Sequence, residues 1–398
     1  MKNIGYTDLP LHKGRVPHWL ASRMAKLGGA ISTAIIEEYG RPAFLSKLTD
    51  PLWFQSLGCV LGMDWHSSGI TTSVLGALKK ALNYKAQELG VFICGGRGKY
   101  SLQTPYELRE LANKTGLNGR DLIRKSKLSA KVDNTAVQDG YSIYLHNFIV
   151  TADGQWAVIQ QGMNVKNGYA RRYHWHSKEL TSLIDEPHKA VCGENQGRIL
   201  NLTAREAVKT RKCMLKMVKT QEISKEIRGF KMPGRHHLES QDVDMKRLGS
   251  VLALAHETDL SSFEDLLLLK GLGPRTLQSL ALVSEIIHGT PSRFKDPARF
   301  SFAHGGKDGH PFPVPLKIYD ETISTLKNAL EKAKIDRSDK VKAFRLLHEQ
   351  SLKIERNFRA DPSQFSKIIE AEKRSSYKYG GMTTNGPAKR PEGQLALF

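Results

Sequence analysis

The chain has 398 residues, of which 40% are hydrophobic, so it is long enough for more than one domain and apolar enough to form a core. Lysine and arginine number 60 against 40 acidic residues, and the net charge of +20 favours a polyanionic partner, most simply nucleic acid. The four cysteines lie far apart without a Cys-x-x-Cys pair, which argues against a cysteine-rich zinc site and a disulfide framework.

The start of the chain lacks the apolar segment of a signal peptide, and no apolar run is long enough to cross a bilayer. We therefore expect no membrane partner and a cytoplasmic, nucleoid-associated location.

Residues 1–228 are predicted to form a mixed α and β domain. Leucine, methionine and isoleucine at helical spacing predict a helix from His18 to Tyr39. The strongest strand signal is a β-hairpin over 141–163, with Asp153-Gly154 in its turn. A basic helix is predicted from Thr203 to about Ile227. This part of the chain is the predicted catalytic domain.

The rest of the chain is predicted to be a linker, a helical domain and a tail. Residues 229–244 are polar and contain Pro, Gly and a His pair, as linkers do. Residues 245–360 read as helical apart from a loop at 302–315, and residues 361–398 are basic and rich in Gly, Ser, Thr and Pro. The predicted fold class is α+β, with a mixed N-terminal domain, an all-helical domain and a flexible C-terminal tail.

The helical domain contains two short amphipathic helices joined by a tight hairpin, between Ser262 and Gly289. Ser262 is placed to cap the first helix, with Asp265 three residues on. The hairpin has the sequence KGLGPRT, in which two glycines supply backbone freedom and a proline stands where the second helix begins. Such a geometry points free backbone N–H groups and a positive helix end outward, which suits a phosphate.

This pattern is similar to the helix-hairpin-helix motif, which grips a DNA backbone phosphate without reading bases. The alternative is an ordinary corner between two helices, whose glycines only make the turn. The first interpretation assigns DNA binding to Lys270, Gly271, Gly273, Pro274, Arg275 and Thr276.

A second basic segment, ARRYHWHS, sets Arg171 and Arg172 among aromatic and imidazole side chains. Arginine binds phosphate and aromatic rings stack on bases, so both arginines are candidate DNA contacts. A basic strand with its aromatic side chains in the core is the equally simple alternative.

Hydrolysis of a phosphodiester by a metal enzyme needs carboxylates that converge on Mg²⁺ or Mn²⁺. Asp64, His66, Asp139 and Glu194 are the candidate metal ligands, and with His174 they are predicted to share one catalytic pocket. The loop HGGKDGH adds Lys307 and Asp308, whose glycine neighbours would let polar groups converge on a phosphate or a metal. Each of these residues taken alone is more commonly structural.

Several blocks in the same order, DWHSSG, GGRGKYSLQTP, QQGMN, ARRYHW and HGGKDGHPFPV, resemble a prokaryotic family catalogued as domain of unknown function 763. The resemblance covers most of residues 5–345 and implies only a loose association with DNA nuclease activity. The hairpin followed by PFPVP is also similar to DNA glycosylases of the helix-hairpin-helix superfamily. However, Pro315 stands where those enzymes have their catalytic aspartate.

The last five residues, QLALF, resemble the peptide with which bacterial replication and repair proteins bind the DNA sliding clamp. Gln394, Leu395, Leu397 and Phe398 would fill a small apolar pocket at the end of a flexible tether. A hydrophobic C-terminus that arose by chance is the alternative.

Together these features predict a metal-dependent nuclease that acts in DNA repair or replication and is recruited by the sliding clamp. A non-catalytic DNA-binding adaptor tethered to the clamp is the second hypothesis, and a glycosylase relative is the third.

Overall fold

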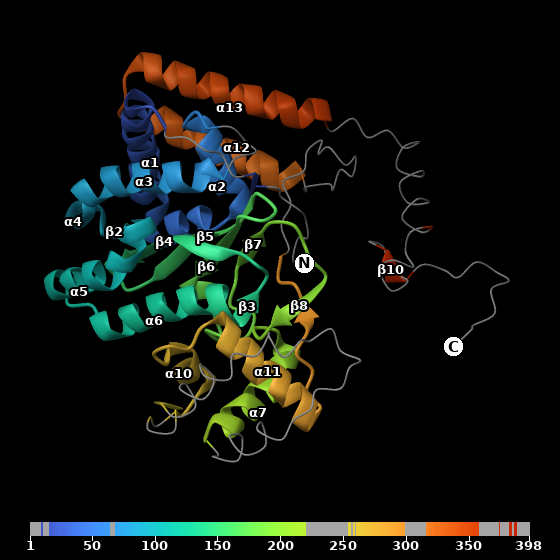
Figure 1. Ribbon diagram of the computed structural model, residues 1–398. Coiled ribbons are helices and arrows are strands. Elements are labelled where there is room, and N and C mark those ends of the chain that lie inside the picture. The colour runs from blue at the N-terminus through green and yellow to red at the C-terminus, as the bar shows by residue number, and fades with distance from the viewer. Residues whose placement is uncertain are drawn as a thin grey trace.

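The computed structural model describes residues 9–10, 16–63, 68–219, 254–255, 258, 260–298, 316–357, 374, 382–383 and 386–387 (Figure 1). Helices and a sheet are both present, which confirms a mixed α+β protein. A central antiparallel sheet separates two layers of helices. In the described ranges, no helix combines the length and the apolar character needed to span a membrane.

The main sheet has the strand order β1-β6-β5-β4-β2, and β7 pairs with β6. Its strands are β1 (Leu9–Pro10), β2 (Val91–Arg97), β4 (Ser142–Thr151), β5 (Trp156–Asn164), β6 (Tyr169–His176) and β7 (Ala190–Cys192). β4 and β5 form the predicted hairpin, with Val150 opposite Trp156 and Asp153-Gly154 in the turn between them. A smaller sheet joins β3 (Val137–Gln138), β8 (Arg198–Asn201) and β9 (Phe294–Lys295), and β10 (Met382–Thr383) pairs with β11 (Gly386–Pro387).

One face of the main sheet is covered by α1 (His18–Leu48), α2 (Pro51–Val60) and α3 (Gly69–Tyr84), with the short α4 (Ala86–Leu89) after them. The helix predicted to end at Tyr39 continues to Leu48 across a kink at Gly40, whose φ of +83° interrupts the helical dihedrals. α12 (Leu316–Lys332) and α13 (Arg337–Asn357) pack on the outside of α1 and α2 (Figure 1). Leu326 and Leu330 thereby join the core that α1 to α3 form with the sheet.

The other face is covered by α5 (Thr104–Thr115) and α6 (Gly119–Lys131), with α7 (Val208–Lys219), α10 (Phe263–Leu268) and α11 (Pro274–His288) packed beyond them (Figure 1). Short helical turns link these elements: η1 (Gly98–Gln103), η2 (Val132–Ala136), η3 (Ser177–Glu179) and η4 (Arg205–Ala207). A single core runs from Phe148 and Trp175 of the sheet to Leu266 of α10 and Leu280 of α11.

The helical region 245–360 is therefore not a self-contained domain. Within it, α10 and α11 share a core with one face of the sheet, and α12 and α13 share a core with the other face. The physical reason is that both faces of the sheet are apolar, so each needs a helical cover. The predicted linker at 229–244 and most of the tail at 361–398 lie outside the described residues.

Candidate nucleic-acid interface

The segment between α10 and α11 has the hairpin geometry that the sequence predicts. Ser262 caps α10, because its hydroxyl accepts from the Asp265 N–H at 3.2 Å and the Asp265 carboxylate accepts from the Ser262 N–H at 3.0 Å. Gly271 has a φ of +87°, which a residue with a Cβ rarely adopts. Gly273 is extended, with φ −127° and ψ −179°, and Pro274 is the first residue of α11.

The hairpin presents unused hydrogen-bond donors at the N-terminus of α11. The backbone N–H groups of Gly273, Arg275 and Thr276 have no acceptor among the described residues. Lys270 and Arg275 are exposed and have no carboxylate partner in the described part of the chain. The Thr276 hydroxyl is buried and also lacks a partner there. The start of a helix is electropositive, and two unpaired cations beside it make this surface suited to an anion.

Contacts from α6 and β3 fix the hairpin in place. The Lys131 ammonium donates to the carbonyl of Leu272 at 2.5 Å, and the Gln138 side-chain amide donates to the carbonyl of Pro274 at 2.7 Å. Leu272 is buried in the same core as the sheet. The donor groups are therefore held on a rigid support rather than on a free loop.

Asp139 lies in a buried ion network. Its carboxylate accepts from Arg171 at 2.9 Å, from the Tyr173 hydroxyl at 2.6 Å and from the backbone of Tyr141 at 3.0 Å. Arg171 also binds both carboxylate oxygens of Asp296, each at 3.0 Å. Burial raises the pKa of Asp139, and the charge of Arg171 opposes that rise. These contacts use the carboxylate internally, so Asp139 has the environment of a structural residue.

Arg172 and His174 lie on the opposite face of the sheet, because neighbouring strand residues alternate between faces. The Arg172 guanidinium donates to His174 Nε2 at 2.8 Å and to the Gln55 side chain at 3.0 Å, and it lies 4.6 Å from the centre of the Phe54 ring. Burial and the charge of Arg172 lower the pKa of His174 well below its usual value.

The prediction that Arg171 and Arg172 contact DNA is therefore wrong for this structure, because both side chains are buried with internal partners. The described members of the predicted single pocket do not converge: the sheet separates His174 from Asp139, and Glu194 is exposed. Glu194 meets the network only through its backbone carbonyl, which accepts from Arg171. Within the described residues, no three His, Cys, Asp or Glu side chains are placed to hold a metal ion. Asp64, His66, Lys307 and Asp308, and the C-terminal Gln394, Leu395, Leu397 and Phe398, lie outside the described residues.

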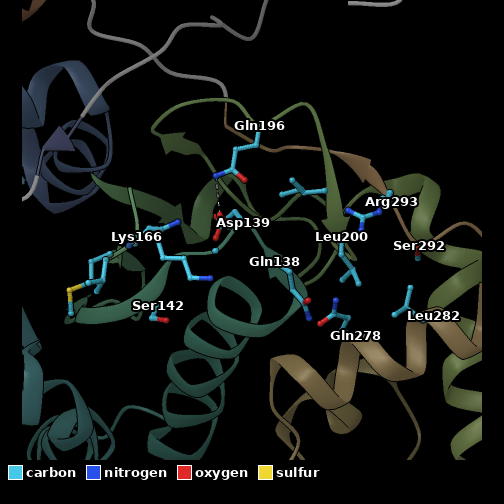
Figure 2. A pocket seen from close by; sticks show the side chains of 15 residues that line it. Gln138, Asp139, Ser142, Lys166, Gln196, Leu200, Gln278, Leu282, Ser292 and Arg293 are labelled. Carbon is cyan, nitrogen blue, oxygen red and sulfur yellow. Dashed lines mark hydrogen bonds between the residues drawn. The ribbon is translucent and has the colours of Figure 1, made fainter. Parts of the chain in front are cut away.

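A cavity of about 650 Å³ with a mixed polar and apolar lining lies beside α11, between that helix and the strands (Figure 2). Gln138 and Gln278 point toward one another across it, and Lys166, Gln196 and Arg293 also line it. Sequence reasoning missed this cavity and the two buried acids Asp133 and Asp296. Asp133 accepts from the Trp175 indole at 2.9 Å and also binds Gln160 and His188. Nothing in the local sequence marks either acid, because each finds its partners far along the chain.

The family described as "Protein of unknown function (DUF763)" has a model that matches residues 5–314 of this chain. The chain belongs to this family. No curated protein and no solved structure gives a significant match.

Proposed function

We propose that this protein binds DNA and grips the phosphate backbone with the hairpin between α10 and α11, acting as a helix-hairpin-helix motif. The observation that carries the proposal is the set of N–H groups at Gly273, Arg275 and Thr276, flanked by the cations Lys270 and Arg275, all without a partner among the described residues. A phosphate oxygen is a strong acceptor with negative charge, so it satisfies the donors and the positive helix end together. Such contacts fix position on the duplex and carry no base preference.

The test is DNA affinity measured by fluorescence anisotropy, with the exposed pair Lys270→Gln and Arg275→Gln as the variant. Removal of one cation that neutralises a phosphate should reduce the slope of log K against log salt by about 0.9, so this variant should reduce it by about two. Circular dichroism serves as the control for folding. A wild-type protein that binds no duplex at low salt, or a variant with an unchanged slope, would overturn the proposal.

The reaction carried out on the DNA is a further part of the proposal: metal-dependent cleavage of the phosphodiester. What supports it is the sequence set Asp64, His66, Lys307 and Asp308 together with the DNA-binding hairpin. Labelled single- and double-stranded DNA should be cut with Mg²⁺ or Mn²⁺ and left intact with EDTA. No cleavage under any condition would favour the adaptor hypothesis, and metal-independent abasic sites would favour a glycosylase relative.

The sliding clamp is the proposed protein partner, supported by the sequence QLALF at the C-terminus. A peptide this short should bind with a dissociation constant on the order of micromolar. Deletion of residues 394–398 should abolish clamp binding and leave DNA affinity unchanged. A C-terminal peptide that gives no heat with a bacterial clamp by calorimetry, while a known clamp peptide does, would identify the match as chance.

A further inference from the structure

A basic groove lies between α5 and α6, with a volume of about 700 Å³. Arg109 of α5 lines it together with Arg120, Arg124 and Lys127 of α6. Leu268, the last residue of α10, also lines the groove, and Figure 1 shows α10 beside α6. No acidic side chain is among the lining residues of this groove.

Four of the five cations of α6 form one stripe that leads from the groove to the hairpin. Arg120, Arg124, Lys127 and Lys131 follow one another at steps of four, three and four residues, which places them on one face of the helix. Lys131, at the C-terminal end of the stripe, donates to the carbonyl of Leu272 in the hairpin. At 1.5 Å per residue the stripe is about 16 Å long.

Three of the groove cations carry charge that the described residues do not balance. Arg124 binds Glu264 at 2.8 Å and Asp265 at 3.2 Å, so it fixes α10 against α6. Arg109, Arg120 and Lys127 are exposed and have no carboxylate partner in the described part of the chain. Exposed lysines and arginines are commonly just solvated. Here, however, the unpaired cations line one hollow, and the helix that carries two of them contacts the hairpin through Lys131.

We propose that this groove is a second contact for DNA, and that the phosphate backbone held at the hairpin continues along α6 into the groove. The inference rests on the proposed function, because the proposed binding of DNA phosphate at the hairpin is the reason to assign the groove to DNA rather than to another polyanion. Duplex DNA advances about 3.4 Å per base pair, so the stripe spans the axial length of about five base pairs. The hairpin and the groove then define one path and a direction for the strand across the protein.

The experiment uses the full chain and a duplex of random sequence, with anisotropy measured between about 50 and 200 mM salt. The groove variant combines Arg109→Gln, Arg120→Gln and Lys127→Gln, and leaves Arg124 in place because it fixes α10. The matched control combines Lys327→Gln, Lys342→Gln and Arg345→Gln, which removes the same charge from exposed positions on α12 and α13. Those helices pack on α1 and α2, on the other side of the sheet.

We expect the groove variant to reduce the salt slope by about three, and to weaken binding about 10- to 1,000-fold at low salt, while the control variant stays close to wild type. If the groove and control variants lose DNA affinity and salt slope equally, the loss comes from net charge rather than from the groove, and the inference is overturned. An unchanged slope in the groove variant, with a reduced slope in the hairpin variant, would overturn the inference and leave the proposed function intact. If the groove variant loses binding to polyglutamate but keeps its DNA binding, the inference is overturned and the groove binds an acidic protein instead.

Discussion

Arg171 and Asp296 lie 125 positions apart in the sequence, and the guanidinium of one donates to both carboxylate oxygens of the other at 3.0 Å. Both side chains are fully buried. This pair ties the segment after α11 to strand β6, so it holds the hairpin unit against the sheet. Planar bidentate pairing is the strongest form of the Arg–carboxylate interaction.

Replacement of Arg171 by Met should therefore destabilise the protein by about 3–5 kcal/mol, because the carboxylates of Asp139 and Asp296 would stay buried without their cation. Urea unfolding followed by circular dichroism measures this decrease in stability. The control adds Asp139→Asn and Asp296→Asn to Arg171→Met, and we expect that triple variant to recover part of the stability. A single variant as stable as wild type would show that the network contributes nothing.

The two hairpin glycines should respond differently to alanine. Gly271→Ala places a Cβ at a φ of +87° and should cost about 1–2 kcal/mol of stability. Gly273 has ordinary extended dihedrals, so Gly273→Ala should leave stability nearly unchanged. Its new methyl group would still stand at the N-terminus of α11, where a phosphate must approach, and DNA binding should weaken. Thermal unfolding and anisotropy separate the two effects, and equal stability changes would contradict the prediction.

Buried histidines should make the protein sensitive to mild acid. Burial lowers the pKa of His146 and His174, and burial with the nearby charge of Lys189 lowers the pKa of His176 to about 4. Below about pH 6.5, the ordinary pKa of histidine, the imidazoles of the unfolded chain take up protons, whereas those of the folded protein stay neutral. The contribution of these neutral imidazoles to the free energy of unfolding is therefore fully present above pH 6.5 and is lost as the pH falls toward 4.

The free energy of unfolding, measured by urea titration from pH 7 to about 4.5, should fall with decreasing pH. His176→Gln removes one of these groups, and its slope should be smaller by up to about 1.4 kcal/mol per pH unit. A profile as steep as that of the wild type would exclude His176 as a source of the acid sensitivity.

The buried thiols should be chemically inert in the folded protein. Burial raises the pKa of Cys94 to about 12 and that of Cys192 to about 11, so almost no thiolate forms near neutral pH. Cys213 is only partly buried and should react first. Alkylation at pH 8, read by mass spectrometry of peptides, checks this order, with denatured protein as the control in which all the thiols react. Labelling of Cys94 as fast as Cys213 would contradict it.

The hairpin could be predicted from the sequence because its determinants are local. The Ser262–Asp265 cap, the glycine at positive φ and the proline at the helix start all lie within a few residues of the turn. The β4–β5 hairpin was predictable for the same reason, since alternation and an Asp-Gly turn specify it.

The burial of Arg171 and Arg172 could not be predicted from local sequence in this way. Strand alternation requires that Arg171 and Arg172 point to opposite faces, but their burial depends on Asp296 and on Gln55, which come from distant elements. The separation of two predicted pocket members has a related cause, because Asp139 and His174 lie on different sides of one sheet. The sequence also did not predict which helices pack on which face of the sheet, since no local pattern shows that α12 and α13 return to pack on α1 and α2.

That return has a consequence for how the protein is made. The core around Ile31 and Phe54 includes Leu330 and Leu347, which leave the ribosome long after the first helices. Contacts of such long range carry a large loop-closure cost and form slowly. A nascent chain that has already completed the hairpin still exposes the apolar outer side of its first helices. In that interval the nascent chain needs protection from aggregation, and truncations that remove α12 and α13 should share the exposure.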